Sequence, residues 1–293
     1  MHGAPDPEQD RRIQDQLSRI KYPILVMSGK GGVGKSTVAV NLAATLAARG
    51  FKVGIMDIDV HGPNVPKMLG IEDQSFTGTD GAIIPVELQS GLKAASIALV
   101  GYHPDEAIIW RGPMKIGLIK QFLGDVVWGD LDYLVIDTPP GTGDESLTIA
   151  QTILNIAGAV IVTTPQDVSI LDSRKSFSFA KKMKVPVLGI VENMSGFVCP
   201  CCGTKTDIFK SGGGQKAAEN LSARFLGSIP IEPGVAIAGD EGSPYHLKAD
   251  SEVAKSMGRV IEGILDQISE NEKAGLYEKK AIPKADPDFR PLR

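Results

Sequence analysis

The sequence predicts a doubly wound α/β fold, in which helices cover both faces of one mostly parallel sheet, built as a single domain. Short apolar runs alternate along the chain with segments of helical periodicity. The apolar runs are continuous rather than alternating with polar residues, which is typical of strands buried on both faces. The chain has 293 residues, of which 42% are hydrophobic and 23% charged, so it can bury a substantial core as an ordinary soluble protein.

The chain begins with a polar leader, residues 1–22. We expect a short helix near Asp10–Ile20, because Ile13, Leu17 and Ile20 recur at helical spacing. The leader lacks the apolar region of a secretory signal, and its acidic residues argue against a transit peptide. Together with clustered cysteines and no disulfide framework, this favours a cytoplasmic protein.

Residues 23–272 are expected to form the main domain, with no linker or internal repeat inside it. The clearest helical patterns are Ser36–Arg49 and Ser169–Met183, and residues 252–272 form a last helix. We expect the proline-rich tail, residues 273–293, to be loose. The predicted strands are Ile24–Met27, Val53–Met56, Tyr133–Ile136, Ala159–Thr163, Val187–Val191 and Phe225–Ile229.

The first strand runs into a glycine-rich turn, "SGKGGVGKST", and a helix follows directly. Gly29, four residues and then Gly34-Lys35-Ser36 match the phosphate-loop pattern. Glycines let successive backbone N–H groups point at phosphate oxygens, and the helix adds its positive N-terminal dipole. We expect Lys35 to contact the β and γ phosphates and the Ser36 hydroxyl to ligate Mg²⁺. The predicted nucleotide-binding residues of the loop are Gly29, Lys30, Gly31, Gly32, Val33, Gly34, Lys35, Ser36 and Thr37.

Carboxylates follow two of the predicted strands, as a magnesium nucleotide requires. "MDIDVHGPN" places Asp57 and Asp59 at the carboxyl end of one strand, two residues apart and so on one face of an extended segment. "LVIDTPPGTGDE" ends another strand in Asp137, the position of a magnesium-binding carboxylate. We expect the nucleotide to be ATP rather than GTP.

The second lysine of the loop, in "GKGGVGKST", resembles the deviant Walker A ATPases, the class that includes MinD, ParA and the nitrogenase iron protein. The resemblance implies a P-loop NTPase fold of the SIMIBI class. It implies that Lys30 reaches across a homodimer to the partner's nucleotide, that Asp59 orients the attacking water, and that Asp57 and Asp137 support Mg²⁺. In "GIVENMSGF", it assigns Asn193 to the adenine edge. In "SIPIEP", Pro230 and Glu232 resemble a second base-contacting loop.

A larger set of motifs resembles the Mrp/ApbC family of P-loop ATPases that carry iron–sulfur clusters. "DIDVHGPN", "WRGPM" (Trp110–Met114), "DTPPGTGDE", "VTTPQDVSILDSRK" and "ENMSGFVCPCCG" stand in the family's order between about Pro23 and Glu262. The resemblance implies an ATPase of slow, switch-like turnover that passes clusters to apo iron–sulfur proteins. The family's Cys-Pro-x-Cys motif falls on Cys199 and Cys202 as cluster ligands.

The chain has three cysteines, Cys199, Cys201 and Cys202, within four positions. Thiolates are soft ligands that favour iron–sulfur clusters or zinc. The Cys199/Cys202 pair supplies two of the four thiolates that a [4Fe–4S] cluster needs, so a symmetric homodimer would complete the set. Cys201 occupies the variable position of the motif and makes a pairing with Cys199 conceivable, although we favour a bystander role.

Other interpretations stay open from the sequence. Zinc could bridge the dimer through the same sulfurs, and a redox Cys-x-x-Cys motif is a weaker alternative. The main alternative function is a positioning or partitioning ATPase of the MinD/ParA kind that binds a membrane or DNA. The net charge of −4 and the mildly amphipathic last helix favour neither a nucleic acid nor a membrane as partner. His61, His103 and His246 are expected to be surface residues.

Overall fold

The computed structural model describes residues 7–78, 81–100, 112–199, 201–245 and 251–277. Several features expected from the sequence lie outside these residues. They are Trp110 and Arg111 of the "WRGPM" motif, Pro200 of the cysteine motif, His103, His246, the first six residues and the tail from residue 278.

Within the described residues, the core of the molecule is one eight-stranded sheet in the order β10-β7-β6-β1-β5-β2-β4-β3. All neighbouring strands are parallel except β3 and β4, which are antiparallel. This arrangement confirms the predicted doubly wound fold. The strands are β1 Ile20–Ser28, β2 Val53–Asp57, β3 Val86–Glu87, β4 Lys93–Ser96, β5 Leu131–Asp137, β6 Gly158–Thr163, β7 Val187–Glu192 and β10 Phe225–Ser228.

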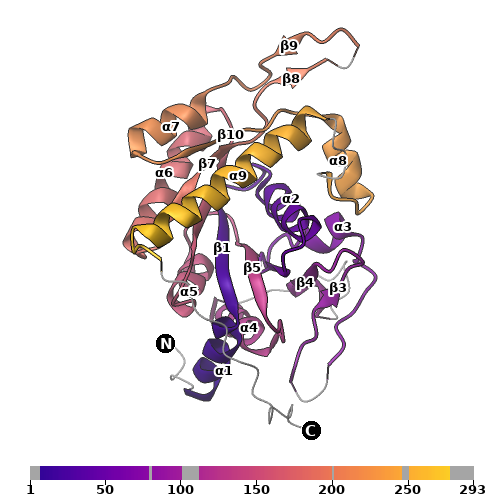
Figure 1. Cartoon of the computed structure of the whole chain (residues 1–293), viewed down its shortest axis with the longest axis vertical. Coiled ribbons are helices and arrows are strands. Elements are labelled where there is room, and N and C mark those ends of the chain that lie inside the picture. Colours follow the sequence, from indigo (N-terminus) through magenta and orange to yellow (C-terminus); the bar gives the residue numbers. More distant parts are fainter. Residues whose placement is uncertain (1–6, 79–80, 101–111, 200, 246–250, 278–293) are drawn as a thin grey trace.

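Helices cover both faces of the sheet (Figure 1). Alternate residues of β1 explain this, because Ile24 and Val26 join one buried cluster while Leu25 and Met27 join another. On the first face lie α2 (Lys35–Ala48), α3 (Val65–Leu69), α8 (Pro233–Asp240) and α9 (Glu252–Lys273). On the second lie α1 (Pro7–Ser18), α4 (Gly112–Asp125), α5 (Asp144–Thr152), α6 (Asp167–Lys182) and α7 (Gly213–Leu221), and a short 3₁₀ helix, η1 (Ile97–Leu99), follows β4.

The N-terminal helix α1 largely coincides with the short helix expected near Asp10–Ile20, and it packs against α4. Its Ile13 and Leu17 are buried in the cluster on the second face. The first strand begins at Ile20, so its first three residues lie inside the segment expected to be a leader. The described part of the leader therefore packs against the domain through the buried side chains of Ile13 and Leu17.

A small hairpin, β8 (Phe197–Val198) and β9 (Lys205–Thr206), carries the cysteines and projects from the body of the molecule (Figure 1). Its short, exposed strands have no apolar pattern, so the sequence did not predict them. The helix α7 and strand β10 follow it and return the chain to the sheet.

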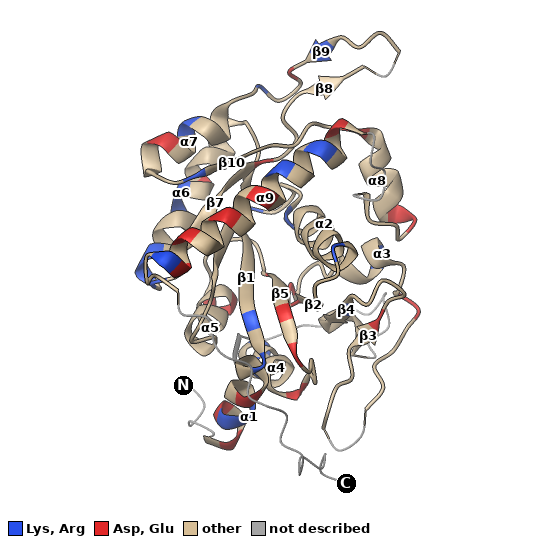
Figure 2. Cartoon of the chain, viewed as in Figure 1, with Lys and Arg blue, Asp and Glu red and all other residues tan. Residues whose placement is uncertain are grey.

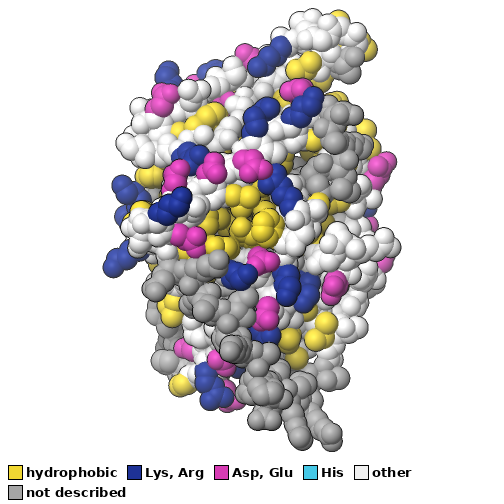
Figure 3. Space-filling view, viewed as in Figure 1, with side chains coloured by type: hydrophobic (Ala, Val, Ile, Leu, Met, Phe, Trp, Pro, Cys, Tyr) yellow, Lys and Arg dark blue, Asp and Glu magenta, His cyan; other side chains and the backbone are white. Residues whose placement is uncertain are grey.

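The last helix α9 buries an apolar face against the domain, through residues that include Val253, Met257, Val260 and Ile264. Its outer face carries both basic and acidic residues (Figure 2). The face of the molecule shown in Figure 3 likewise mixes positive and negative side chains. Among the described helices, none combines the length and the apolar character that crossing a bilayer requires.

Candidate nucleotide site and cysteine turn

The phosphate loop connects the end of β1 at Ser28 to the start of α2 at Lys35. Two of its glycines are required by their surroundings. Gly34 has a φ of 82°, and a Cβ on it would lie 2.1 Å from the amide nitrogen of Asn193. A Cβ on Gly29 would lie 2.2 Å from the backbone of Asp172. The loop is therefore held closely between α6 and the segment that follows β7.

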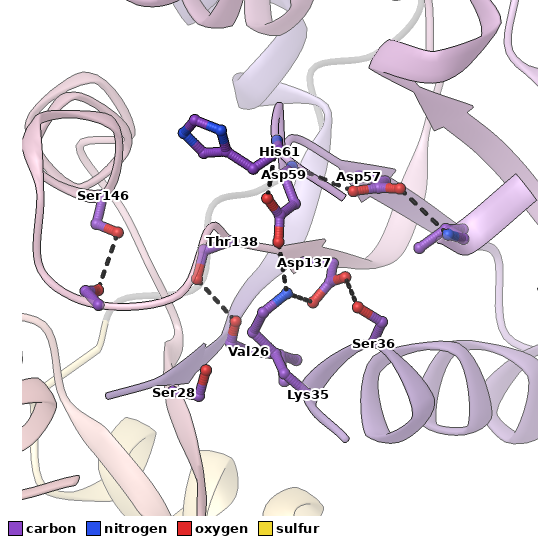
Figure 4. Close-up of polar contacts among 12 residues, drawn as sticks. Val26, Ser28, Lys35, Ser36, Asp57, Asp59, His61, Asp137, Thr138 and Ser146 are labelled. Atoms are coloured by element: carbon purple, nitrogen blue, oxygen red, sulfur yellow. Dashed lines mark hydrogen bonds and ion pairs between the residues drawn. The ribbon is translucent and has the colours of Figure 1, made fainter. Parts of the chain in front are cut away.

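Lys35 and Ser36, the first two residues of α2, contact the carboxylate at the end of β5 (Figure 4). The Lys35 Nζ lies 2.6 Å from Asp137 Oδ1 and 3.7 Å from Asp59 Oδ2. The Ser36 hydroxyl donates to Asp137 Oδ2 at 2.6 Å. The structure thus brings the predicted lysine, hydroxyl and carboxylates into one buried cluster.

Asp57 and Asp137 are direct neighbours, because they end the adjacent parallel strands β2 and β5 in register. Both are completely buried. Burial, followed by the charge of Asp137, raises the pKa of Asp57 to about 8. Burial also raises the pKa of Asp137, against the opposing effect of Lys35. Two crowded carboxylates and a serine hydroxyl are oxygen donors that suit a divalent cation, so the residues fit Mg²⁺.

Asp59 lies just beyond the strand end, and its position is fixed by backbone hydrogen bonds. Its N–H donates to Asp57 Oδ1 and its own Oδ1 accepts from the His61 N–H, both at 3.2 Å. It is buried and faces Lys35. Across the site, the Thr138 hydroxyl donates to the Val26 carbonyl at 2.9 Å, which holds the turn after β5 beside the loop.

Lys30 differs from Lys35 in its surroundings. Its carbonyl accepts a hydrogen bond from the Ser28 hydroxyl at 2.9 Å, and its side chain is partly exposed. Among the residues that the structure describes, Lys30 has no ion-pair partner. An exposed, unpaired cation on the phosphate loop is available to a group outside this chain.

A cavity of about 420 Å³ opens beside the start of α2, next to Thr37. Its lining includes Asn193, Pro230 and Glu232, which the sequence assigned to the base. The Asn193 amide nitrogen donates to the Val33 carbonyl of the phosphate loop at 2.9 Å. Glu232 accepts a hydrogen bond from the Tyr245 hydroxyl. The remaining lining is largely apolar and includes Met68, Met194, Phe209, Ile231, Val235 and Met257.

The cysteines lie on the turn between β8 and β9. The Cys199 N–H donates to the Thr204 carbonyl at 3.0 Å, and the Gly203 N–H donates to the Cys199 carbonyl at 2.8 Å. Gly203 takes a φ of 71°, a conformation that favours glycine. These bonds close a turn with Cys199 at one end and Gly203 and Thr204 at the other, and Cys202 lies within it.

The thiols of Cys199 and Cys202 are neighbours within this turn. The pKa of Cys202 is lowered first by the Thr204 hydroxyl, then by the Thr204 backbone N–H and by the Cys199 thiol. Cys201 and Cys202 are exposed and all three cysteines are free. Within the described part of the chain, no three or more His, Cys, Asp or Glu side chains form a group that could hold a metal ion. One chain therefore presents a pair of thiols at its surface.

Three residues near these sites were missed from the sequence. Met194 and Phe209 line the cavity beside the start of α2. Glu192 ends β7 fully buried, immediately before Asn193. For Glu192 a signal was available, because a charged residue ending an apolar strand must find buried partners. Met194 and Phe209 carried no such signal, since their role depends on how a loop folds back.

Comparison with known proteins identifies related chains over most of this length. The family model described as NUBPL iron-transfer P-loop NTPase matches residues 19–265. An "iron-sulfur cluster carrier protein" of Methanocaldococcus jannaschii is 52% identical over 260 residues, covering 88% of this chain and 90% of that protein. A "cytosolic Fe-S cluster assembly factor NUBP2 homolog" of Trichoplax adhaerens is 46% identical over 257 residues, covering 86% of this chain and 97% of that protein.

Solved structures agree with this assignment of the fold. A nucleotide-binding protein from Archaeoglobus fulgidus, solved in complex with ADP, is 42% identical with a TM-score of 0.70, and the match covers 80% of this chain and 91% of that one. The cell division ATPase MinD of Pyrococcus furiosus is 25% identical with a TM-score of 0.61, covering 84% of this chain and 99% of that one.

Proposed function

Because the chain belongs to the NUBPL-type family of iron-transfer P-loop NTPases, we propose that it is an ATP-hydrolysing carrier of iron–sulfur clusters. The observation that carries the proposal is the presence, in one chain, of a phosphate loop held against buried carboxylates and of an exposed two-thiol turn. The first site uses the nucleotide and the second holds the cargo. The names of the relatives, iron–sulfur carriers and assembly factors, support this division of roles.

In the nucleotide site, the phosphates of ATP would lie in the loop Gly29–Thr37, where backbone N–H groups and Lys35 bind them. Ser36, Asp57 and Asp137 would hold Mg²⁺, which supplies charge neutralisation for the phosphates. Asp59 would orient the attacking water, since it is fixed beside Lys35 by hydrogen bonds from both directions. The adenine would enter the cavity lined by Asn193, Pro230 and Glu232. The switch-like role implies slow turnover.

At the cysteine turn, Cys199 and Cys202 would supply two thiolates and a second copy of the chain would supply two more. Such a homodimer would hold a [4Fe–4S] cluster between its subunits, and the same four sulfurs could hold zinc. An exposed turn suits a cargo that must be handed to apo iron–sulfur proteins. We place this activity in the cytoplasm, as the name "cytosolic Fe-S cluster assembly factor" of relatives supports.

The test is anaerobic reconstitution followed by quantification of iron, sulfide and zinc per dimer. We expect absorption near ~400 nm, typical of cysteine-ligated clusters, in the wild-type protein and in Cys201→Ser. Cys199→Ser and Cys202→Ser should lose the cluster, because each removes two of four ligands from a symmetric site. Equal iron in all four proteins would refute the carrier function.

The alternative is a positioning ATPase of the MinD/ParA kind, which shares the fold and the nucleotide site. Its anchor would need an accessible amphipathic helix, whereas α9 buries its apolar face in the domain. Sedimentation with anionic vesicles and with DNA separates the two functions. ATP-dependent binding to either one would favour the alternative.

A further inference from the structure

The cysteine turn belongs to a longer excursion of the chain, residues 195–212, which we call the cysteine arm. Both ends of this arm are held by one side chain, Glu192. Its Oε1 accepts from the Ser195 hydroxyl at 2.5 Å and from the Gly212 N–H at 3.0 Å. Its Oε2 accepts from the Gly214 N–H at the start of α7. Because Glu192 is completely buried, these donors replace the water that its carboxylate would otherwise need.

The next residue, Asn193, is attached to the nucleotide site. Its side-chain nitrogen donates to the Val33 carbonyl of the phosphate loop, and its backbone N–H donates to the Thr163 carbonyl at 2.8 Å. The close approach of Gly34 leaves no space between the loop and this asparagine. At the end of β7, Asn193 therefore holds the phosphate loop and its neighbour Glu192 holds the cysteine arm.

The residue between Asn193 and the arm is strained. Met194 has a φ of 57°, a left-handed conformation that is costly for a residue with a side chain. This conformation turns the chain sharply, so that Met194 lines the base cavity while the Ser195 N–H donates to the Ile229 carbonyl at 2.9 Å. The arm also returns to the same cavity, where Phe209 forms part of the lining.

We propose that Glu192 is a positioning residue that, together with Asn193, couples occupancy of the nucleotide cavity to the position of the cysteine turn. A bound adenine would contact Asn193 and Met194, which directly precede the arm, and Phe209, which lies within it. Glu192 transmits this contact because it holds the two ends of the arm to one rigid strand end. The inference rests on the proposed function for the assignment of the cavity to adenine and of the turn to the cargo.

The test measures the reaction rate of the Cys199 and Cys202 thiols with a disulfide reagent, in metal-free protein carrying Cys201→Ser. Adding Mg²⁺ and a non-hydrolysable ATP analogue should slow the reaction about fivefold or more, a typical allosteric coupling. In Glu192→Gln this nucleotide effect should disappear. Glutamine keeps the size of the side chain but presents an NH₂ group where the Ser195 or glycine donors need an acceptor.

The affinity for the analogue should change less than about threefold in Glu192→Gln, well under the coupling expected between sites. This readout separates loss of coupling from general damage to the fold. The matched control is Glu219→Gln on α7, an exposed glutamate whose recorded partner is the neighbouring Gln215. It should keep the wild-type nucleotide effect. If Glu192→Gln fails to fold, Ser195→Ala removes one of the three bonds and should reduce the effect partly.

The proposal would be overturned by the absence of a nucleotide effect on the thiols of the wild-type protein, or by an unchanged effect in Glu192→Gln. Loss of the effect in Glu219→Gln as well would also overturn it, because the coupling would not depend on Glu192. Cluster content is measured separately on the wild-type protein. A protein that binds no cluster but shows the Glu192-dependent effect would refute the proposed function and leave the coupling standing.

Discussion

Lys35 is the residue on which the charge balance of the nucleotide site depends. It is buried between Asp137 and Asp59, and Asp137 is paired in register with the equally buried Asp57. One lysine cannot neutralise three carboxylates, which is why burial and mutual repulsion keep the pKa of Asp57 far above its usual range. A divalent cation bound here would supply the positive charge that lets the crowded carboxylates ionise together.

Phe209 is the aromatic residue of the base cavity, and we predict that it stacks on the adenine. Phe209→Ala should weaken binding of ATP roughly tenfold, the loss expected when a base loses an aromatic stacking partner. Isothermal titration of metal-free protein with an ATP analogue and Mg²⁺ measures it. The matched control is Ile208→Ala, because Ile208 is the adjacent residue but is exposed and outside the cavity lining. Equal affinities for both variants would show that the base does not contact Phe209.

The residues of the phosphate site could be predicted individually from the sequence, whereas only some of the residues that line the cavity could be. Lys35 and Ser36 follow the end of β1 in a recognisable motif and Asp137 ends a buried apolar run, and the pairing of β1 with β5 brings them together. Asn193 and Pro230 were proposed from resemblance, and the structure places both at the cavity. Phe209 comes from a loop that returns from the cysteine turn, and nothing in its local sequence indicates where that loop goes.

At the scale of elements, the pairing of β1 with β5 fixes the site, because it aligns Val26 with Asp137 and so puts the phosphate loop beside the carboxylate. At the opposite end of these strands, Asp132 accepts from the Lys21 ammonium and from the Lys52 N–H that precedes β2. Asp132 thereby connects three neighbouring strands. Burial alone would raise the pKa of Asp132, but these donors outweigh it and lower the pKa.

We predict that this pair stabilises the fold at neutral pH and not in acid. A carboxyl whose pKa is lowered by folding contributes stability above its unfolded pKa and loses it as the pH falls through its folded pKa. A double-mutant cycle with Lys21→Met and Asp132→Asn should give a coupling of about 0.5–1 kcal/mol at pH 7. The coupling should fade toward pH 3, near and below the normal carboxyl pKa. Urea unfolding at the two pH values measures it.

The control for this cycle is the exposed pair Lys67 and Glu72, whose side chains lie 2.8 Å apart. Exposed pairs are screened by solvent, so Lys67→Met with Glu72→Gln should show little coupling at either pH. A coupling between Lys21 and Asp132 that stayed constant down to pH 3 would contradict the assigned charge interaction. It would point instead to packing of the lysine stem along β5.

The six long parallel strands were predictable because each is a continuous apolar run, and all six lie in the sheet. The last two strands of the sheet order, β4 and the edge strand β3, were not, since Val86–Glu87 has only two residues and Lys93–Ser96 consists largely of small residues. They are strands because β4 pairs with β2 and β3 in turn pairs with β4, which depends on tertiary structure and not on their own sequences. The strands β8 and β9 likewise were not predictable from their own residues, because they form only where the turn between them brings the two segments together.

At the scale of the whole molecule, the described part of one chain contains two incomplete sites. The cysteine turn offers a pair of thiols, and Lys30 lies on the phosphate loop without a recorded ion-pair partner in the described residues. A single symmetric dimer would complete both, since a twofold axis gives each subunit the same groups from its partner. The nucleotide and the cargo would then depend on the same association.

We predict that Lys30 acts in the partner's nucleotide site. Lys30→Gln alone should hydrolyse ATP at most at a few per cent of the wild-type rate, because the negative charge that develops on the phosphates loses a cation. Asp59→Asn alone should be similarly slow, because the attacking water is no longer oriented. In a mixture of the two variants, a mixed dimer has one site with Asp59 and with Lys30 from the partner. Activity should therefore reappear on mixing.

If Lys30 acted within its own chain, each subunit of the mixed dimer would still lack one group, and the mixture would stay as slow as its components. Phosphate release is the measurement, and the comparison requires that both variants bind the ATP analogue with wild-type affinity.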